Sequence, residues 1–181
     1  LSYAIDCSNT VSFYAQGPLG NVRLSSPDVA YGAVGDSSEI YGLEYEHSSG
    51  PWMIEPYVQY MHTPKSPLLN VNHSFSNYGA AVLADYSITN TISLAGRVEY
   101  LDVGGHPGET LNSSSVASSL TDLPADSHAW SITVTPTYQD GGFFARADLS
   151  YVTASAPSGY GLSGGTNTTQ LRGMLETGFM F

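Results

Sequence analysis

The last eleven residues of the chain alternate between two kinds of position. Odd positions from Leu171 to Phe181 carry no charge and are mostly apolar, whereas even positions include Arg172 and Glu176. Because side chains of a β-strand point alternately to its two faces, this segment predicts a strand with one apolar and one charged face. Such a strand favours aggregation in a soluble protein, but in an outer-membrane barrel its apolar face contacts lipid. The closing segment therefore favours a membrane barrel.

The composition agrees with an all-β chain. Hydrophobic residues make up 41% of the 181 residues, and no apolar run approaches the roughly 20 residues of a membrane helix. In a membrane barrel, polar residues that face the lumen alternate with apolar residues in each strand, so the mean hydropathy of the strand is low. The 19 glycines and 13 tyrosines suit turns and strands better than helices. The length leaves room for one domain, residues 1–181.

The charge excludes one class of partner. Five Lys and Arg against 16 Asp and Glu give a net charge of −11, and nucleic-acid binding needs clustered positive charge. We therefore expect no nucleic-acid partner. The single cysteine, Cys7, cannot form an internal disulfide and is interpreted as an inert thiol in a turn.

Segments with a period of two recur along the whole chain and predict about eight antiparallel strands. They lie at 10–16, 39–47, 52–62, 75–87, 91–103, 128–138, 143–152 and 170–181. Leu1–Ile5 is interpreted as the end of a preceding strand, which would make nine. The short links at 48–51, 88–90 and 139–142 alternate with long links at 17–38, 63–74, 104–127 and 153–169. Tight turns at one end and long loops at the other are typical of an outer-membrane barrel.

The charges within the strands fall on one face. With the apolar positions placed outward, no charge inside a strand lies among them, and an outward Arg or Lys would cost about 2–4 kcal/mol at the membrane midplane. Aromatic residues gather near both ends of the outward face, as expected for rings at two membrane interfaces. Pro56 and Pro136 are outward positions that fit less well, because proline removes a ladder hydrogen bond and usually marks an edge or a bulge.

Five segments, in this order and spacing, resemble a known family. They are PWMIEPYVQYMHTP (51–64), SLAGRVEYL (93–101), AWSITVTPTYQ (129–139), FFARADLSYV (143–152) and TQLRGMLETGFMF (169–181). The chain is similar to the carboxy-terminal half of OmpL-like beta-barrel porins. The resemblance implies an antiparallel transmembrane β-barrel in the outer membrane of a Gram-negative cell, of which this chain would be the carboxy-terminal part.

The resemblance also implies partners. They are outer-membrane lipid, small polar solutes that diffuse passively, and the barrel-assembly machinery, which would recognise the strand that ends at Phe181. A homo-oligomer is a further partner that we consider. No cofactor and no enzymatic activity are implied.

Seven charged residues on the predicted lumen face are the candidate pore-lining residues. They are Arg97, Arg146, Arg172, Glu55, Glu99, Asp148 and Glu176. Opposed charges across a constriction would set ion preference. If the charges instead pair with each other, they would plug a small barrel, because an interior of about eight strands is filled by side chains.

Other motifs carry less weight. The run from Gly159 to Gly164 spells GxGxxG, but no helix is predicted after it, and a dinucleotide site needs one. The five histidines (His47, His62, His73, His106 and His128) lie at strand ends or in long links and share no metal-ligand spacing. The alternatives to a porin are a closed small barrel with a structural, adhesive or partner-binding role, an outer-membrane hydrolase with its site at the rim, and a soluble β-sandwich.

Overall fold

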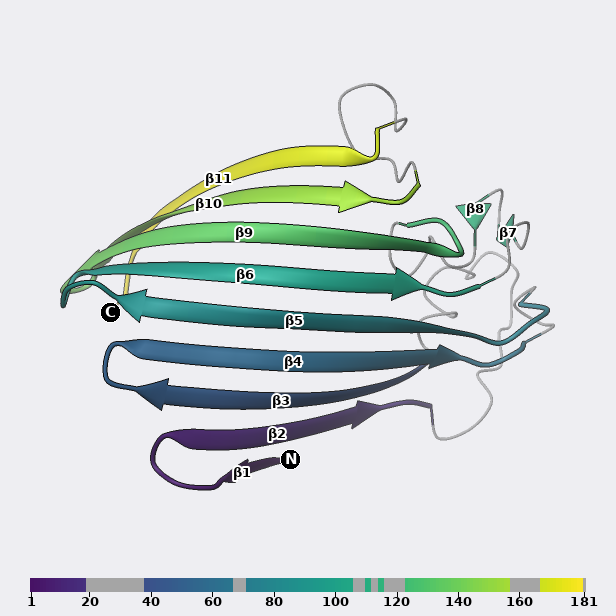
Figure 1. The fold of residues 1–181 in the computed structure, drawn as a ribbon, viewed down its shortest axis with the longest axis horizontal. Coiled ribbons are helices and arrows are strands. Elements are labelled where there is room, and N and C mark those ends of the chain that lie inside the picture. Colours follow the sequence, from purple (N-terminus) through teal and green to yellow (C-terminus); the bar gives the residue numbers. More distant parts are fainter. Residues whose placement is uncertain are drawn as a thin grey trace.

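The strands form one antiparallel sheet in the order in which they occur in the sequence (Figure 1). The computed structural model describes residues 1–18, 38–66, 71–105, 110–111, 114–115, 123–156 and 167–180. The sheet contains β1 (Ser2–Ala4), β2 (Asn9–Gln16), β3 (Glu39–Ser49), β4 (Trp52–Thr63), β5 (Phe75–Ser87), β6 (Ile92–Val103), β9 (Ser127–Asp140), β10 (Phe143–Ala154) and β11 (Thr169–Phe179). A separate ribbon pairs β7 (Thr110–Leu111) with β8 (Ser114–Ser115).

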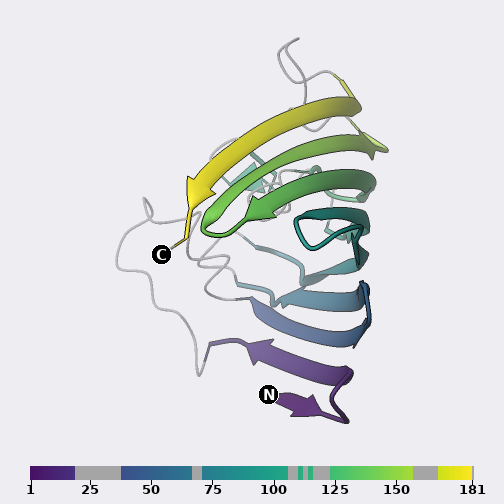
Figure 2. The same ribbon diagram turned by 90° about the vertical axis from the view of Figure 1, so that its left-hand side faces the viewer.

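The sheet bends into an arc whose two edges are β1 and β11 (Figure 2). All its neighbouring strands pair antiparallel, and the described ranges contain no helix. The predicted all-β, antiparallel fold class is confirmed, and the sheet is open. Within the described part of the chain, no helix has the length and hydropathy needed to cross a membrane.

The predicted strands agree with the observed ones to within about two residues at each end. The strand end expected within Leu1–Ile5 is present as β1, which pairs with β2. The prediction that 104–127 is only a link was incomplete, because β7 and β8 form within it. β11 ends at Phe179, and Phe181 lies outside the described residues.

The tight turns have identifiable causes. Gly50 and Gly141 adopt positive φ angles of 59° and 56°, a conformation that glycine reaches without a Cβ clash. The Thr89 hydroxyl accepts hydrogen bonds from the Thr91 and Ile92 amides at 3.2 and 3.0 Å. In the β1–β2 turn, Asp6 accepts the Ser8 amide at 2.8 Å, and this bond lowers the pKa of the carboxyl. These turns all lie at one end of the sheet, opposite the long links (Figure 1).

The two prolines lie in interior strands and pair on one side only. Pro56 faces Val82 of β5, and Pro136 faces Leu94 of β6. On the other side of each proline the ladder is interrupted. The β3–β4 ladder has no pair between Tyr57 and Ile54, and the β9–β10 ladder has none between Thr137 and Val134. Both prolines, which fit the strand pattern less well, are thus accommodated in interior strands, since the missing N–H interrupts one ladder and leaves the other intact.

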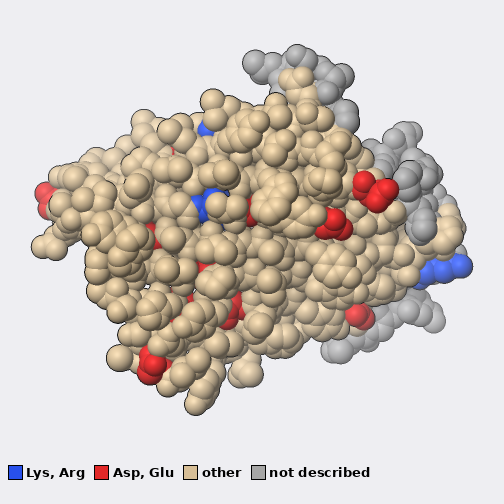
Figure 3. All heavy atoms as spheres, in the orientation of Figure 1, with Lys and Arg blue, Asp and Glu red and all other residues tan. Residues whose placement is uncertain are grey.

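The convex face of the arc is apolar and exposed. Register places Leu43 beside Val58, and Val98 beside Ile132. Leu43, Val58, Val98 and Ile132 are 44–53% exposed. Figure 3 views this face, and most of it carries neither acidic nor basic atoms. It is the face that the sequence predicted to point outward.

Aromatic rings line both ends of the convex face. At the short-turn end, Trp52 contacts Tyr86 with ring centroids 4.5 Å apart, and Phe143 contacts Phe179 at 5.4 Å. At the other end, Tyr60 contacts Tyr78 at 5.2 Å, and Tyr100 contacts Trp130 at 4.6 Å. The ring pairs join neighbouring strands and form two rows on either side of the aliphatic band.

The concave face contains the buried core, which lies at the long-link end. Its apolar members are Val71, Phe75, Val103, Leu123, Ala129 and Ala154. Polar contacts lie at the same end of the sheet: Ser38 Oγ lies 2.8 Å from Thr63 Oγ1, and the Gly104 amide donates to Asn77 Oδ1 at 3.1 Å. Val71 and Leu123, which lie outside the strands of the sheet, are fully buried, and Leu123 lines the inner wall together with residues of β4, β5 and β9.

Candidate pore wall

Polar side chains of the concave face interact across neighbouring strands. Register places Arg97 opposite Thr133, and Glu99 opposite Ser131. Thr133 Oγ1 donates to Ser150 Oγ at 3.0 Å and continues the polar contacts to β10. Since the convex positions between these residues are apolar, alternation along the strands separates the two chemistries.

Arg97 and Glu99 form an ion pair within one strand. Arg97 Nη2 lies 3.2 Å from Glu99 Oε2, and Ser131 Oγ donates to the same oxygen at 2.7 Å. Their side chains are 45% and 29% exposed, so both remain in contact with solvent. The hydroxyl and the guanidinium together orient the Glu99 carboxylate.

Arg146 and Glu176 pair across β10 and β11. Arg146 donates through Nε at 2.7 Å and approaches through Nη2 at 2.6 Å, both to Glu176 Oε2. The two residues are direct partners in the register. Close to them, Asp148 accepts a hydrogen bond from Thr135 Oγ1 at 2.5 Å.

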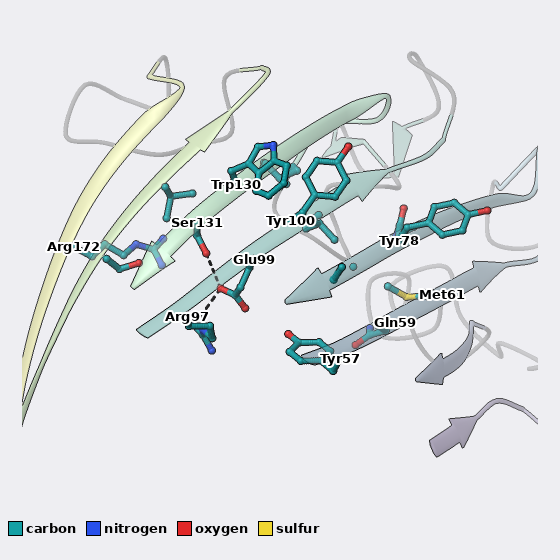
Figure 4. A pocket seen from close by; sticks show the side chains of 18 residues that line it. Tyr57, Gln59, Met61, Tyr78, Arg97, Glu99, Tyr100, Trp130, Ser131 and Arg172 are labelled. Atoms are coloured by element: carbon teal, nitrogen blue, oxygen red, sulfur yellow. Dashed lines mark hydrogen bonds and ion pairs between the residues drawn. The ribbon is translucent and has the colours of Figure 1, made fainter. Parts of the chain in front are cut away.

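A cavity of about 330 Å³ lies against the inner wall between β4 and β11. Figure 4 shows Tyr57 and Gln59 directed toward it from β4, with the Arg97–Glu99–Ser131 cluster on β6 and β9. Arg172 extends toward it from β11, and its Nε donates to Gln170 Oε1 at 2.7 Å. The lining combines an aromatic ring, amides, hydroxyls and charges, which suits a polar solute.

Glu55 lies apart from the arginines. It faces Leu83 of β5, whose other neighbour is Arg97 on β6. The seven candidate residues therefore share the concave face without forming one cluster. The structure brings together Arg97 with Glu99 and Arg146 with Glu176, and it leaves Glu55 among other acidic residues.

Some features of this wall were not predicted from the sequence. Tyr14 of β2 lies over Gly42 of β3, where an added Cβ would meet its ring, and Tyr14 donates to Gln59 Oε1 of β4 at 3.0 Å. Phe144 covers Gly178 in the same way. Glycine opposite an aromatic residue on a neighbouring strand is the signal that could have identified both contacts.

The histidines do not assemble into a site in the described part of the chain. His47 Nδ1 lies 2.8 Å from Asn9 Oδ1, and His62 Nδ1 lies 3.1 Å from Ser76 Oγ. His128 packs beside the Tyr100 ring, and His106 lies outside the described residues. No group of three or more His, Cys, Asp or Glu among the described residues could hold a metal ion.

Comparison with known proteins identifies the family. No curated protein and no solved structure matches the chain. The model of one family, described as "Putative beta-barrel porin-2, OmpL-like", matches residues 1–181. Membership of this family suggests an outer-membrane channel without enzymatic activity. The chain thus belongs to the OmpL-like beta-barrel porin-2 family.

Proposed function

We propose that this chain forms part of the wall of an outer-membrane channel through which small polar solutes or ions diffuse passively. The separation of chemistry between its two faces supports this proposal most directly. The convex face offers lipid an aliphatic band between two aromatic rows, and the concave face offers water a wall of ion pairs and hydroxyls. Family membership points the same way.

The seven charged residues form the polar lining in this proposal. Arg97, Arg146, Arg172, Glu55, Glu99, Asp148 and Glu176 would contact permeating water and solutes. Fixed charges of this kind repel ions of like sign and concentrate those of opposite sign. The channel needs no cofactor, since passage follows the solute gradient.

We also propose that further strands complete the barrel. Unpaired backbone groups are costly in lipid, so the free edges of β1 and β11 require partners. A closed barrel of about eight strands would be filled by side chains, whereas a water channel needs about sixteen. β11 and Phe181 would serve as the element that the barrel-assembly machinery recognises. The exposed convex face is compatible with self-association of complete barrels.

A closed small barrel with a structural or partner-binding role is the second candidate. The Arg97–Glu99 and Arg146–Glu176 pairs favour it, because charges that satisfy each other can fill an interior. Its long links would carry the binding function. A hydrolase at the rim has less support, since the family whose model matches the chain is described as a porin family.

Planar-bilayer recording separates the two candidates. The full-length protein is purified in detergent, added to a planar bilayer, and held at constant voltage in KCl. We expect discrete conductance steps for a channel. If circular dichroism shows that the protein is folded and no conductance steps are recorded, the plugged barrel would be favoured.

A further inference from the structure

We infer that the channel conducts cations in preference to anions, and that three glutamates of β3 and β4 set this preference. They are Glu44, Glu46 and Glu55, hereafter the acidic strip. This inference rests on the proposed channel function and names the class of solute that the pore favours.

The register gathers the acidic strip on the concave face. Glu44 faces Tyr57, and His47 faces Ile54, so the same register places Glu46 opposite Glu55. All three side chains are half-buried. Like charges directly opposite each other across two strands destabilise a sheet. Their presence in one place suggests a role other than stability.

The strands on either side do not neutralise the acidic strip. On β2, Ser12 faces Glu44 and Thr10 faces Glu46. On β5, Leu83 faces Glu55. Among the described residues, the ion pairs of arginine are with Glu99 and Glu176, and none is with these three carboxylates.

The arginines of the wall lie on other strands than the acidic strip, and the register separates Arg97 from Glu55 by Leu83 of β5. Arg97 belongs to β6, Arg146 to β10 and Arg172 to β11. Arg97 and Arg146 each pair with a carboxylate, so their charge is locally compensated. The charges of Arg97 and Arg146 therefore oppose the field of the acidic strip only weakly.

The whole concave face has an excess of negative charge. Its described strands carry seven acids (Glu44, Glu46, Glu55, Asp85, Glu99, Asp148 and Glu176) and three arginines (Arg97, Arg146 and Arg172), an excess of four acids. The 181-residue sequence is acidic as well, with 16 Asp and Glu against five Lys and Arg. Both the local and the total balance favour cations.

Coulomb's law indicates the size of the effect. One unit charge about 6 Å from an ion in water changes the local ion concentration about threefold. Salt at about 0.1 M reduces this effect, with a screening length of about 10 Å. Three carboxylates act together, so cations should exceed anions in permeability by several-fold at that ionic strength.

Reversal potentials test the inference. The full-length protein is recorded in a planar bilayer under a KCl gradient, and the ratio of potassium to chloride permeability is calculated. The variant Glu44→Gln, Glu46→Gln, Glu55→Gln removes the charges of the acidic strip with little change in shape. We expect this variant to keep its conductance steps, and we expect its ratio of potassium to chloride permeability to fall at least about threefold.

A matched control removes three acidic charges from other positions. The variant Glu39→Gln, Asp102→Asn, Asp140→Asn changes strand-end residues whose alternation places them on the convex face. It has the same change in net charge and should keep the wild-type permeability ratio. An equal loss of selectivity in this control would overturn the role of the acidic strip.

The possible outcomes separate this inference from the proposed function. Absence of conductance from the folded wild-type protein would reject the channel and the inference together. Conductance with a wild-type permeability ratio near one, or in favour of chloride, would reject the inference and leave the channel standing. The wild-type measurement alone is decisive in this respect, so the inference stays falsifiable even if the triple variant does not fold.

Discussion

The convex and concave faces of the sheet are built from the same strands, but they differ in which side chains are exposed to the surroundings. On the convex face Leu149 is 58% exposed and Val58 is 53% exposed. On the concave face Ala81 is 5% exposed and the hydroxyl of Thr133 is hydrogen-bonded to Ser150. The apolar side chains of a soluble sheet are buried in a core, whereas here the more apolar face is the more exposed one.

This difference indicates what surrounds the convex face. Soluble monomers rarely expose contiguous apolar patches of more than a few hundred Å², and the convex band extends over every long strand of the sheet. The aromatic rows at its two ends match the position of amphipathic rings at membrane interfaces. An apolar solvent on one side and water on the other explains both faces with a single alternation.

A charge on the convex face should give the largest effect. Val134 lies near the middle of β9, beside Gly96 and Leu149. Val134→Arg should lower the free energy of unfolding by about 2–4 kcal/mol, because it places a guanidinium in hydrocarbon. Urea titration in lipid vesicles, followed by tryptophan fluorescence, measures the change.

The matched control places the same side chain on the other face. Ala95 of β6 points to the concave side and faces Asp85, so Ala95→Arg introduces a guanidinium opposite a carboxylate. We expect a change of less than about 1 kcal/mol. Equal losses in the two variants would contradict the assignment of lipid to the convex face.

Packing on the concave face should give the next effect. A Cβ added at Gly42 would meet the Tyr14 ring and displace it from Gln59. Gly42→Ala should therefore destabilise the protein by about 1–3 kcal/mol, the usual range for overpacking. The same urea titration measures it.

Gly96→Ala is the control for this substitution, because nothing lies within 4 Å of a Cβ added there. It should change the free energy of unfolding by less than about 1 kcal/mol, as a strand gains from losing glycine. In a protein that already carries Tyr14→Ala, the substitution Gly42→Ala should be nearly neutral. If Gly42→Ala still lowered the free energy of unfolding by the same amount in that background, the strain would not arise at the Tyr14 ring.

Alternation in the sequence was sufficient to predict most of the fold. The strand limits, the outward face and the aromatic rows all follow from a period of two, because one face had to be apolar throughout. Long-range information was missing. The register of β2 with β3 is what places Tyr14 over Gly42, and the glycine and the aromatic residue can be recognised as partners only once this register is known.

The prolines and the acidic strip show the same limit. Pro56 and Pro136 fit the strand pattern poorly, but the sheet accommodates each of them by interrupting one ladder. Alternation puts Glu44 and Glu46 on the same face of β3, yet only the register of β3 with β4 shows that Glu46 lies opposite Glu55. Which charges pair and which remain uncompensated depends on the arrangement of strands.

The Arg146–Glu176 pair should give the smallest effect and distinguishes a wet wall from a plugged interior. The two side chains are 47% and 42% exposed, and exposed ion pairs contribute about 0–1 kcal/mol. A double-mutant cycle with Arg146→Met and Glu176→Gln, measured by urea titration, should give a coupling energy in that range. A coupling of several kcal/mol would mean that the pair is removed from water, as in a closed and filled barrel. That result would also favour the structural alternative over the channel.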